Sequence, residues 1–558
     1  MSSIQRFLRP CLGILLFSLA GAALFSQSAA NTSASATAEA DTLHQQLPYH
    51  LGYGQTTSLM VGTVQRVDET QFNQGLISDP ALLLQAKVAG LHVNQASGDP
   101  NEFSTLRLRG LAAIEGDIAP LIVVDGVVGA SWIHLDPNDI AEVTVLKDAA
   151  AAAIYGTRAS NGVLLVRTKS SVDTNGKVRL TYQGQVGAST LQNNIPVMNR
   201  EEFLAAGGTD LGSNTNWQDA IVRTGISQAH HLALTTQAGP AKFRLSVNYR
   251  EVEGILRTSG FQQFNLQMNT VLTGAQDRLR LRLLANLNNR RSDYGFTEAF
   301  HYATIYNPTA PIFGVDAPTP FPSEQYGGYY ENLGLFDSFN PVSLLEQNTR
   351  QDRQNNYLLS AQLAYQLATR WTLNTQISYQ QNNVLERAIY APTALFRGNA
   401  ASPTSKGTAD FYDGSNRFTL LESYVNYAHQ GERSRIAWLM GTSWQQFDRS
   451  ETASSFGNLG TDVSRLYESF RPANELFLPP TLLQVASMGS QDRRALALFT
   501  RGQFSFRSGL FFDVSLRHEQ LGIKALSPWV TLPGISAGWK LVRGLAQGQQ
   551  LLLRVGYG

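Results

Sequence analysis

Few residues in this sequence have the spacing that catalysis or metal binding requires. His230 and His231 are adjacent at the start of an expected strand, where neighbouring side chains point to opposite faces and cannot chelate one metal ion together. Asp125 and Asp148 precede turns, so we predict that they are turn and cap residues rather than acid or base catalysts. The sequence contains no Ser/His/Asp motif, Walker A loop or HExxH motif. We therefore predict no enzymatic activity, no metal site and no cofactor.

Aromatic residues in two long connections are the candidates for ligand contact. They are Trp217, Tyr302, Tyr306, Tyr326, Tyr329 and Tyr330. Aromatic rings can stack on sugars and peptides while a polar edge stays in water. The alternative is that the rings pack within their own loops or against neighbouring segments, and for any single residue this alternative is favoured.

The composition limits the class of protein. Charged residues make up 16% of the 558 residues and the formal net charge is +1. Such a balance argues against a nucleic-acid partner, which requires a basic footprint. No long apolar run follows the N-terminus, so we expect no transmembrane helix, and a β-barrel is the membrane architecture that stays open.

The first 30 residues have the pattern of a secretory signal peptide, with Arg6 and Arg9 before an apolar stretch and Ser28-Ala29-Ala30 at its end. The single cysteine, Cys11, falls within this signal. The mature chain would then have neither disulfides nor a cysteine-based zinc site. Residues 31–51 are polar and are predicted to be a flexible N-terminal arm.

The segment from 52 to 172 reads as a small α/β domain. Leu121–Val124 is a continuous apolar run, which predicts a strand buried on both faces. Asp136-Pro137 and Asp148 are predicted to begin short helical turns, and Gly156 is predicted to end the second with a left-handed conformation. Asn161-Gly162 predicts a tight turn before a last strand at Val163–Arg167.

The same segment resembles the plug domain of SusC/RagA-family TonB-linked outer-membrane receptors. The resemblance rests on Gly52-Tyr53-Gly54, LLQAKVAGLHV, LRLRG, PLIVVDG and DPNDIAEVTVLKDAAAAAIYGTRASNGVLLVRTK, which occur in that order. The residues that carry the plug signature are Asp125, Gly126, Pro137, Asn138, Asp139, Lys147, Asp148, Tyr155, Gly156, Asn161 and Gly162. The resemblance implies a plug that blocks a barrel lumen until the inner-membrane TonB-ExbB-ExbD complex pulls on a segment ahead of it.

The segment ahead of the plug departs from the family pattern. Families of this type show a valine-rich run there, whereas this chain has LHQQLPYHL at 43–51. Strand addition to a partner requires free backbone N–H groups, and Pro48 lacks one. Coupling to TonB is thus implied by the resemblance but has little support from these residues.

Residues 177–558 show the alternation expected of a partial outer-membrane β-barrel. In Arg278–Asn288 the odd positions from Leu279 to Leu287 are apolar, the even positions are mostly polar, and Leu284 is the exception. About 13 strands are predicted, with short turns near 238–241, 273–277, 368–370, 430–432 and 508–509 alternating with long connections at 191–227, 292–352, 386–414 and 449–491. A soluble β-sandwich would alternate too, but the alternation of short and long connections favours a barrel. The predicted fold class is therefore mainly β.

Further motifs, including NPTAP at 307–311 and LLLRVGYG at 551–558, also resemble the family. The family barrel has 22 strands, so about 13 strands predict a C-terminally truncated chain. The resemblance implies TonB-dependent import of a large glycan or peptide oligomer through the outer membrane, together with a SusD-like surface lipoprotein. Two alternatives stay open: a truncated, non-transporting remnant or surface binding protein, and an importer of a siderophore or vitamin complex.

Overall fold

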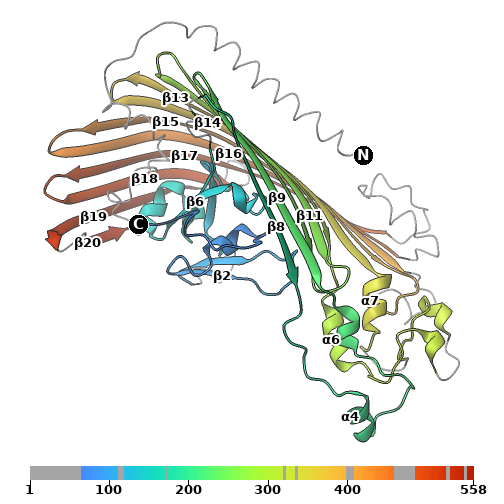
Figure 1. Cartoon of the computed structure of the whole chain (residues 1–558). Coiled ribbons are helices and arrows are strands. Elements are labelled where there is room, and N and C mark those ends of the chain that lie inside the picture. Colours follow the sequence, from blue (N-terminus) through green and yellow to red (C-terminus); the bar gives the residue numbers. More distant parts are fainter. Residues whose placement is uncertain are drawn as a thin grey trace.

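The computed structural model describes residues 64–110, 118–170, 174, 176–317, 322–333, 337–396, 407–457, 484–522, 528–545 and 549–558. Two parts are evident in Figure 1: a wide, curved antiparallel sheet and a smaller α/β unit on its concave side. We call the sheet the wall and residues 64–170 the plug unit. The predicted signal peptide, the N-terminal arm and the segment ahead of the plug lie outside the described residues.

The plug unit is built on a five-stranded sheet with the order β1-β6-β7-β4-β5. Its strands are β1 (Val64–Asp68), β4 (Leu121–Val124), β5 (Val127–Val128), β6 (Ile140–Leu146) and β7 (Val163–Thr168). A separate antiparallel pair consists of β2 (Leu91–Asn94) and β3 (Thr105–Leu108). The apolar run predicted to be a strand is β4, which pairs in parallel with β7 and is mostly buried.

Short helical turns connect these strands: η2 (Pro80–Leu84), η3 (Pro137–Asp139), α3 (Ala149–Ala152), η4 (Ala153–Tyr155) and η5 (Thr157–Ala159). Asp136 caps η3 as predicted, because its carboxylate accepts the Asn138 N–H at 2.9 Å. Asp148 stands at the N-cap position of α3 but makes no capping hydrogen bond. Its carboxylate instead pairs with Arg109 at 3.0 Å. The prediction that the Asp148 side chain caps this helical turn is therefore wrong.

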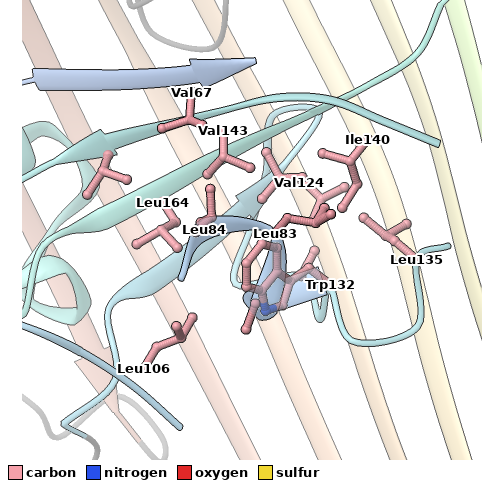
Figure 2. Packing of buried hydrophobic residues seen from close by; sticks show 14 of the residues in the cluster. Val67, Leu83, Leu84, Leu106, Val124, Trp132, Leu135, Ile140, Val143 and Leu164 are labelled. Atoms are coloured by element: carbon pink, nitrogen blue, oxygen red, sulfur yellow. The ribbon is translucent and has the colours of Figure 1, made fainter. Parts of the chain in front are cut away.

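Apolar side chains from the plug strands and from η2 fill the centre of the plug unit. Figure 2 shows Val67, Leu84, Val143, Leu164 and Trp132 within this cluster. The same cluster includes side chains of the wall, namely Leu284, Leu358, Phe418 and Leu420. The plug core is therefore completed by the wall, and apolar burial contributes to holding the two parts together.

The wall contains 13 antiparallel strands in sequence order from β8 to β20. They are β8 (Arg179–Ser189), β9 (Gly225–Ala238), β10 (Ala241–Glu253), β11 (Gly260–Gly274), β12 (Leu279–Asp293), β13 (Thr349–Ala368), β14 (Trp371–Tyr390), β15 (Thr408–Gln430), β16 (Ser434–Gly457), β17 (Gln484–Phe506), β18 (Leu510–Gly522), β19 (Trp529–Leu545) and β20 (Gln549–Tyr557). The predicted number of strands and the mainly β fold are confirmed. Within the described residues, no helix is long and apolar enough to cross a membrane.

Several wall strands are longer than predicted. Strands β14 and β15 pair from Trp371↔Tyr427 to Tyr390↔Thr408, across much of the long connection expected at 386–414. Likewise, β16 runs on to Gly457 and pairs with a β17 that begins at Gln484, inside the connection expected at 449–491. The extensions carry either polar residues on both faces, as in the run from Arg449 to Thr452, or consecutive apolar residues, as in Ala388-Ile389-Tyr390. They lack the alternation that marks a strand in sequence, yet the backbone pairing continues.

The two faces of the wall differ in character. One face carries exposed apolar side chains at alternate positions, as on β18 with Leu510, Phe512, Val514 and Leu516. The intervening positions face the plug unit and are largely polar and buried. Leu284, the exception to the predicted alternation, lies on this inner face and contacts the plug core. The alternation is therefore interrupted at Leu284 because this side chain contacts the plug core.

The long connections at one end of the wall carry the remaining helices. These are α4 (Arg200–Ala205), α5 (Trp217–Ile221), α6 (Glu298–Ile305), η6 (Gly314–Asp316), η7 (Ser323–Tyr326) and α7 (Pro341–Gln347). Figure 1 shows α6 and α7 close together beyond the strand ends, with α4 farther out. At the opposite end, successive strands are joined by short turns, as predicted.

Candidate functional site at the plug–wall interface

The most buried polar contact between the two parts centres on Asp139. This carboxylate is fully shielded from solvent. It accepts hydrogen bonds from three successive inward-facing residues of β10: Arg244 (2.8 Å), Ser246 (2.7 Å) and Asn248 (2.6 Å). The pair with Arg244 joins two buried, opposite charges, and such charge-assisted bonds are stronger than neutral ones. The sequence had marked Asp139 only as one residue of the plug signature.

Two neighbouring carboxylates extend this contact along the wall. Arg250 on β10 donates to Asp136 at 3.3 Å and to the Ile77 carbonyl at 2.6 Å. On β12, Arg282 donates to Asp125 at 3.0 Å. Asp125 also accepts the Thr168 hydroxyl hydrogen bond at 2.6 Å, so it ties β4 to β7 and to the wall at once. We call Asp125, Asp136 and Asp139 with their arginines the acidic seam.

The turn predicted at Asp125 lies within this seam. Asp125 and Gly126 form the tight turn between β4 and β5, with φ angles of 47° and 87°. A turn with positive φ at both central positions suits an Asp-Gly pair. The same geometry points the Asp125 carboxylate at β7 and β12. One residue therefore serves both the local turn and the contact with the wall.

A second polar contact lies across the plug unit, where the wall supplies the carboxylate. Glu519 on β18 accepts from the Thr157 N–H at 2.6 Å and the Thr157 hydroxyl at 2.8 Å. Arg517 holds the Glu519 carboxylate at 2.6 Å and donates to the Ile154 carbonyl at 3.2 Å. Close by, Arg158 donates to Gln445 at 2.5 Å. Burial, with the charge of Arg517, lowers the pKa of Arg158 to about 10, so it is still a cation at neutral pH.

Small residues allow the plug helix α3 to touch the wall. A Cβ on Gly534 would lie 2.9 Å from the Ala150 carbonyl oxygen, and one on Gly558 would lie 2.6 Å from the Ala150 nitrogen. At Gly156 a Cβ would collide with the Glu519 carboxylate, and its φ of 90° already favours glycine. The alanine run of the plug signature is therefore matched by a glycine on β19 and by Gly558, which directly follows β20.

The other signature residues hold the plug unit together internally. Lys147 donates to the Gln65 side chain and the Ala89 carbonyl, both at 2.7 Å. Tyr155 is buried in a cluster between the plug and the wall, and Asn161 donates to the Ala119 carbonyl at 3.5 Å. Gly162 has a φ of 85° and packs too closely on Leu108 for a side chain. Pro137 and Asn138 form the capped turn η3.

Burial also changes the titration of two plug side chains. It lowers the pKa of Lys147, with the nearby Arg109 charge acting in the same direction. Burial lowers the pKa of His134 to about 3, so this imidazole is neutral at physiological pH. The carbonyl of His134 accepts a hydrogen bond from Asn265 of β11 at 2.6 Å. Neither group adjoins a nucleophile arrangement, and the described residues hold no cluster of metal-ligating side chains.

The candidate ligand-contact aromatics gather in one core within the outer connections. Trp217, Tyr302 and Tyr306 are buried in this core, and Tyr329 and Tyr330 pack against it. Tyr326 is buried as well. Trp217 donates to the Asn307 carbonyl at 2.9 Å and stands edge-on to Tyr306, with ring centroids 4.8 Å apart. The structure thus gives these four rings a packing role, which was the alternative. Of the six candidates, Tyr329 and Tyr330 keep partly exposed rings.

Sequence reasoning missed the wall residues that face the plug. Arg244, Arg250, Arg282, Arg517 and Glu519 are all buried or nearly so, although charged residues rarely are without a partner. The sequence does show these residues, as charged positions on the polar face of strands whose other face is apolar. A water-filled lumen would explain such charges equally well, so only the position of the plug unit identifies their partners.

The acidic seam joins two parts that are each known from other proteins. Residues 58–163 match the family described as the TonB-dependent Receptor Plug Domain. The TonB-dependent receptor SusC of Bacteroides thetaiotaomicron is 26% identical over 91% of this chain. The chain carries a TonB-dependent receptor plug domain and is similar to SusC along most of its length. A second relative, the TonB-dependent receptor P26 of Formosa agariphila, is 26% identical over 95% of the chain.

The chain spans about half the length of these curated relatives, 52% of SusC and 54% of P26. Among solved structures, the chain shares the fold of the RagAB peptide importer in its open-open state, with a TM-score of 0.72 and 19% sequence identity. The match covers 92% of this chain and 61% of the RagAB chain. The ferric citrate transporter FecA has a TM-score of 0.53 at 11% identity, with coverage of 87% and 61%. These relatives are named as receptors, importers and transporters, not as enzymes.

Proposed function

We propose that this chain gates the active import of a large nutrient through the outer membrane, with the plug unit as the gate. The domain division behind the proposal is a plug over 52–172 and a membrane wall over 177–558. The observation that carries it is the acidic seam, in which buried plug carboxylates are held by buried wall arginines. A closed gate needs contacts that fix one position, and charge pairs with several directed hydrogen bonds are specific to a single geometry.

The polar contacts also suit a gate that must open. A buried ion pair adds little net stability compared with an apolar contact of the same volume, because both charges lose their hydration. When the plug moves, water can reach both partners and restore that hydration. A force from TonB would act on the N-terminal side of the plug, where β1 is an edge strand whose only partner among the described residues is β6. This strand would transmit the pull to β6, which leads directly back to Asp139 and the seam.

The substrate class proposed is a glycan or peptide oligomer, delivered by a SusD-like surface lipoprotein. Support comes from the SusC relatives and from the likeness to a peptide importer in fold. The outer connections present Tyr329 and Tyr330 as partly exposed rings above a rigid aromatic core. Such rings could contact either class by stacking, so the choice between a glycan and a peptide is left to experiment.

Import can be tested in a deletion strain complemented with the wild-type gene. Growth on defined oligosaccharides and on defined oligopeptides as sole carbon sources would be compared with and without complementation. The proposal predicts that growth on one of these oligomer classes requires the gene, while growth on the corresponding monomers does not. Equal growth of the deletion and complemented strains on every oligomer would contradict import and favour a surface-binding role.

A cysteine lock would test the gate itself. A Cβ at Gly556 would lie 3.6 Å from the Ala150 Cβ, close to the separation of about 3.8 Å found in disulfides. The double variant Ala150→Cys/Gly556→Cys should lose uptake when oxidised and regain it after reduction. The single cysteine variants are matched controls and should import under both conditions. Normal uptake by the fully oxidised double variant would show that the plug does not need to leave this position.

A further inference from the structure

The short-turn end of the wall carries a row of arginines outside the plug–wall interface. Four hairpin turns in succession each contain one: Arg278 between β11 and β12, Arg370 between β13 and β14, Arg433 between β15 and β16, and Arg507 between β17 and β18. All four are exposed. We propose that this arginine rim binds the phosphate headgroups of the adjoining membrane leaflet. The inference rests on the membrane placement within the proposed function.

The spacing of the rim follows from the sheet. Each arginine lies two strands from the next, which separates their backbones by about 10 Å along the edge of the wall. Single cations at that spacing can each meet a separate headgroup instead of converging on one ligand. A guanidinium suits phosphate because its planar fork can donate two parallel hydrogen bonds. One donor of Arg278 reaches the Leu367 carbonyl at 3.4 Å, which places this side chain along the rim.

Aromatic side chains lie immediately beside the rim on the exposed apolar face. Trp371 directly follows Arg370, is 42% exposed, and packs with Tyr427 at a centroid distance of 4.9 Å. Trp438 pairs in register with Tyr427 on the neighbouring strand and is 50% exposed. Aromatic belts of this kind mark the level of the headgroups in membrane proteins. The arginines therefore stand where the apolar surface ends and the phosphates would begin.

The charge balance of these turns favours an anionic partner. The same turns contain two acids, Asp277 and Glu432, while Lys242 at the neighbouring turn adds a further cation. An acidic soluble protein could also be attracted to this edge. The headgroup layer is the better fit because the row follows the edge of the wall directly beside the aromatic belt, and a bilayer surrounds that edge along its whole length.

Tryptophan fluorescence offers a direct test, because Trp371 and Trp438 stand at the rim. The full chain would be reconstituted in phosphatidylcholine vesicles containing a small fraction of brominated phosphatidylglycerol. Quenching would be compared with the same fraction of brominated phosphatidylcholine. We expect stronger quenching by the anionic lipid, reduced at high salt. The double variant Arg370→Gln/Arg433→Gln should lower the relative binding constant of the anionic lipid about fivefold for each arginine removed.

The matched control is Arg417→Gln/Arg493→Gln, which removes two exposed arginines toward the opposite end of the wall strands. This control should leave the preference for the anionic lipid at the rim unchanged. Equal quenching of the wild type by both lipids, or an equal loss of preference in both double variants, would overturn the proposal. Absence of quenching by either lipid would instead show that the wall is not inserted, which separates a failed membrane placement from a failed rim.

Discussion

Replacing Asp139 by asparagine is the sharpest test of the acidic seam. The substitution keeps the shape of the side chain but removes its charge. Arg244 then stays buried without its counter-charge, and the new amide group presents donors to the donors of Ser246 and Asn248. Removing one partner of a buried ion pair costs about 3–5 kcal/mol. We expect a loss of this size in the stability of the plug against local opening, with the wall unaffected.

Native-state hydrogen exchange of the membrane-inserted protein would measure the effect. The probes are backbone amides of β6 and β7, whose side chains fill the plug core. A loss of about 3 kcal/mol should speed exchange through local opening roughly a hundredfold or more. Amides of β13 and β14, which lie in the wall, should keep their rates. Exchange in β6 within about threefold of the wild type would refute the view that this pair fixes the plug.

A matched carboxylate variant distinguishes the seam from a general charge effect. Glu69 pairs with Lys169 at 2.7 Å, but its side chain is 58% exposed. Exposed pairs contribute about 0–1 kcal/mol, so Glu69→Gln should leave exchange in β6 nearly unchanged. A double-mutant cycle with Asp139→Asn and Arg244→Gln would then isolate the coupling between those two side chains.

Three further predictions concern other parts of the molecule. Gly156→Ala should destabilise the plug by about 1–3 kcal/mol from the positive φ alone, with a further cost from the collision with Glu519, measurable as faster exchange in η5. Burial raises the pKa of Glu331 in the outer connections from 4.5 to about 7. Because the folded-state pKa lies above the unfolded value, the folded loop binds more protons between these pH values, and its stability falls as pH rises through them. The full loss of stability with rising pH is about 3 kcal/mol, and Glu331→Gln should abolish this pH dependence. Hydrogen exchange in α7 at pH 5 and pH 8 would measure it. An unchanged pH dependence in the variant would assign the effect to another group. Trp217→Phe should cost about 1 kcal/mol from the lost hydrogen bond to the Asn307 carbonyl and lower the thermal stability of the outer connections. An equal stability would show that this hydrogen bond makes no net contribution.

Local sequence patterns predicted much of the fold. Apolar alternation predicted the wall strands and their number, since a strand with one face toward lipid and the other toward polar surroundings must alternate. Turn chemistry predicted Asp125-Gly126 and Asn161-Gly162, because positive φ angles restrict the residue types. The strand extensions in β14 to β17 were missed because their polar and apolar residues do not alternate, as in Ala388-Ile389-Tyr390. Pairing there depends on the neighbouring strands rather than on side-chain pattern.

The sequence by itself determined the plug signature, the resemblance to TonB-dependent receptors, and the alternation of short and long connections, because each is encoded within a few residues of chain. Tertiary structure decided what the charged residues do. Asp139 and Arg244 are separated by 105 residues, and no local pattern links a helical turn to a distant strand. The same holds for Thr157 and Glu519, for the glycines that admit the alanine helix, and for the aromatic rings that close on one another. These contacts exist only when the wall curves around the plug and removes water from both.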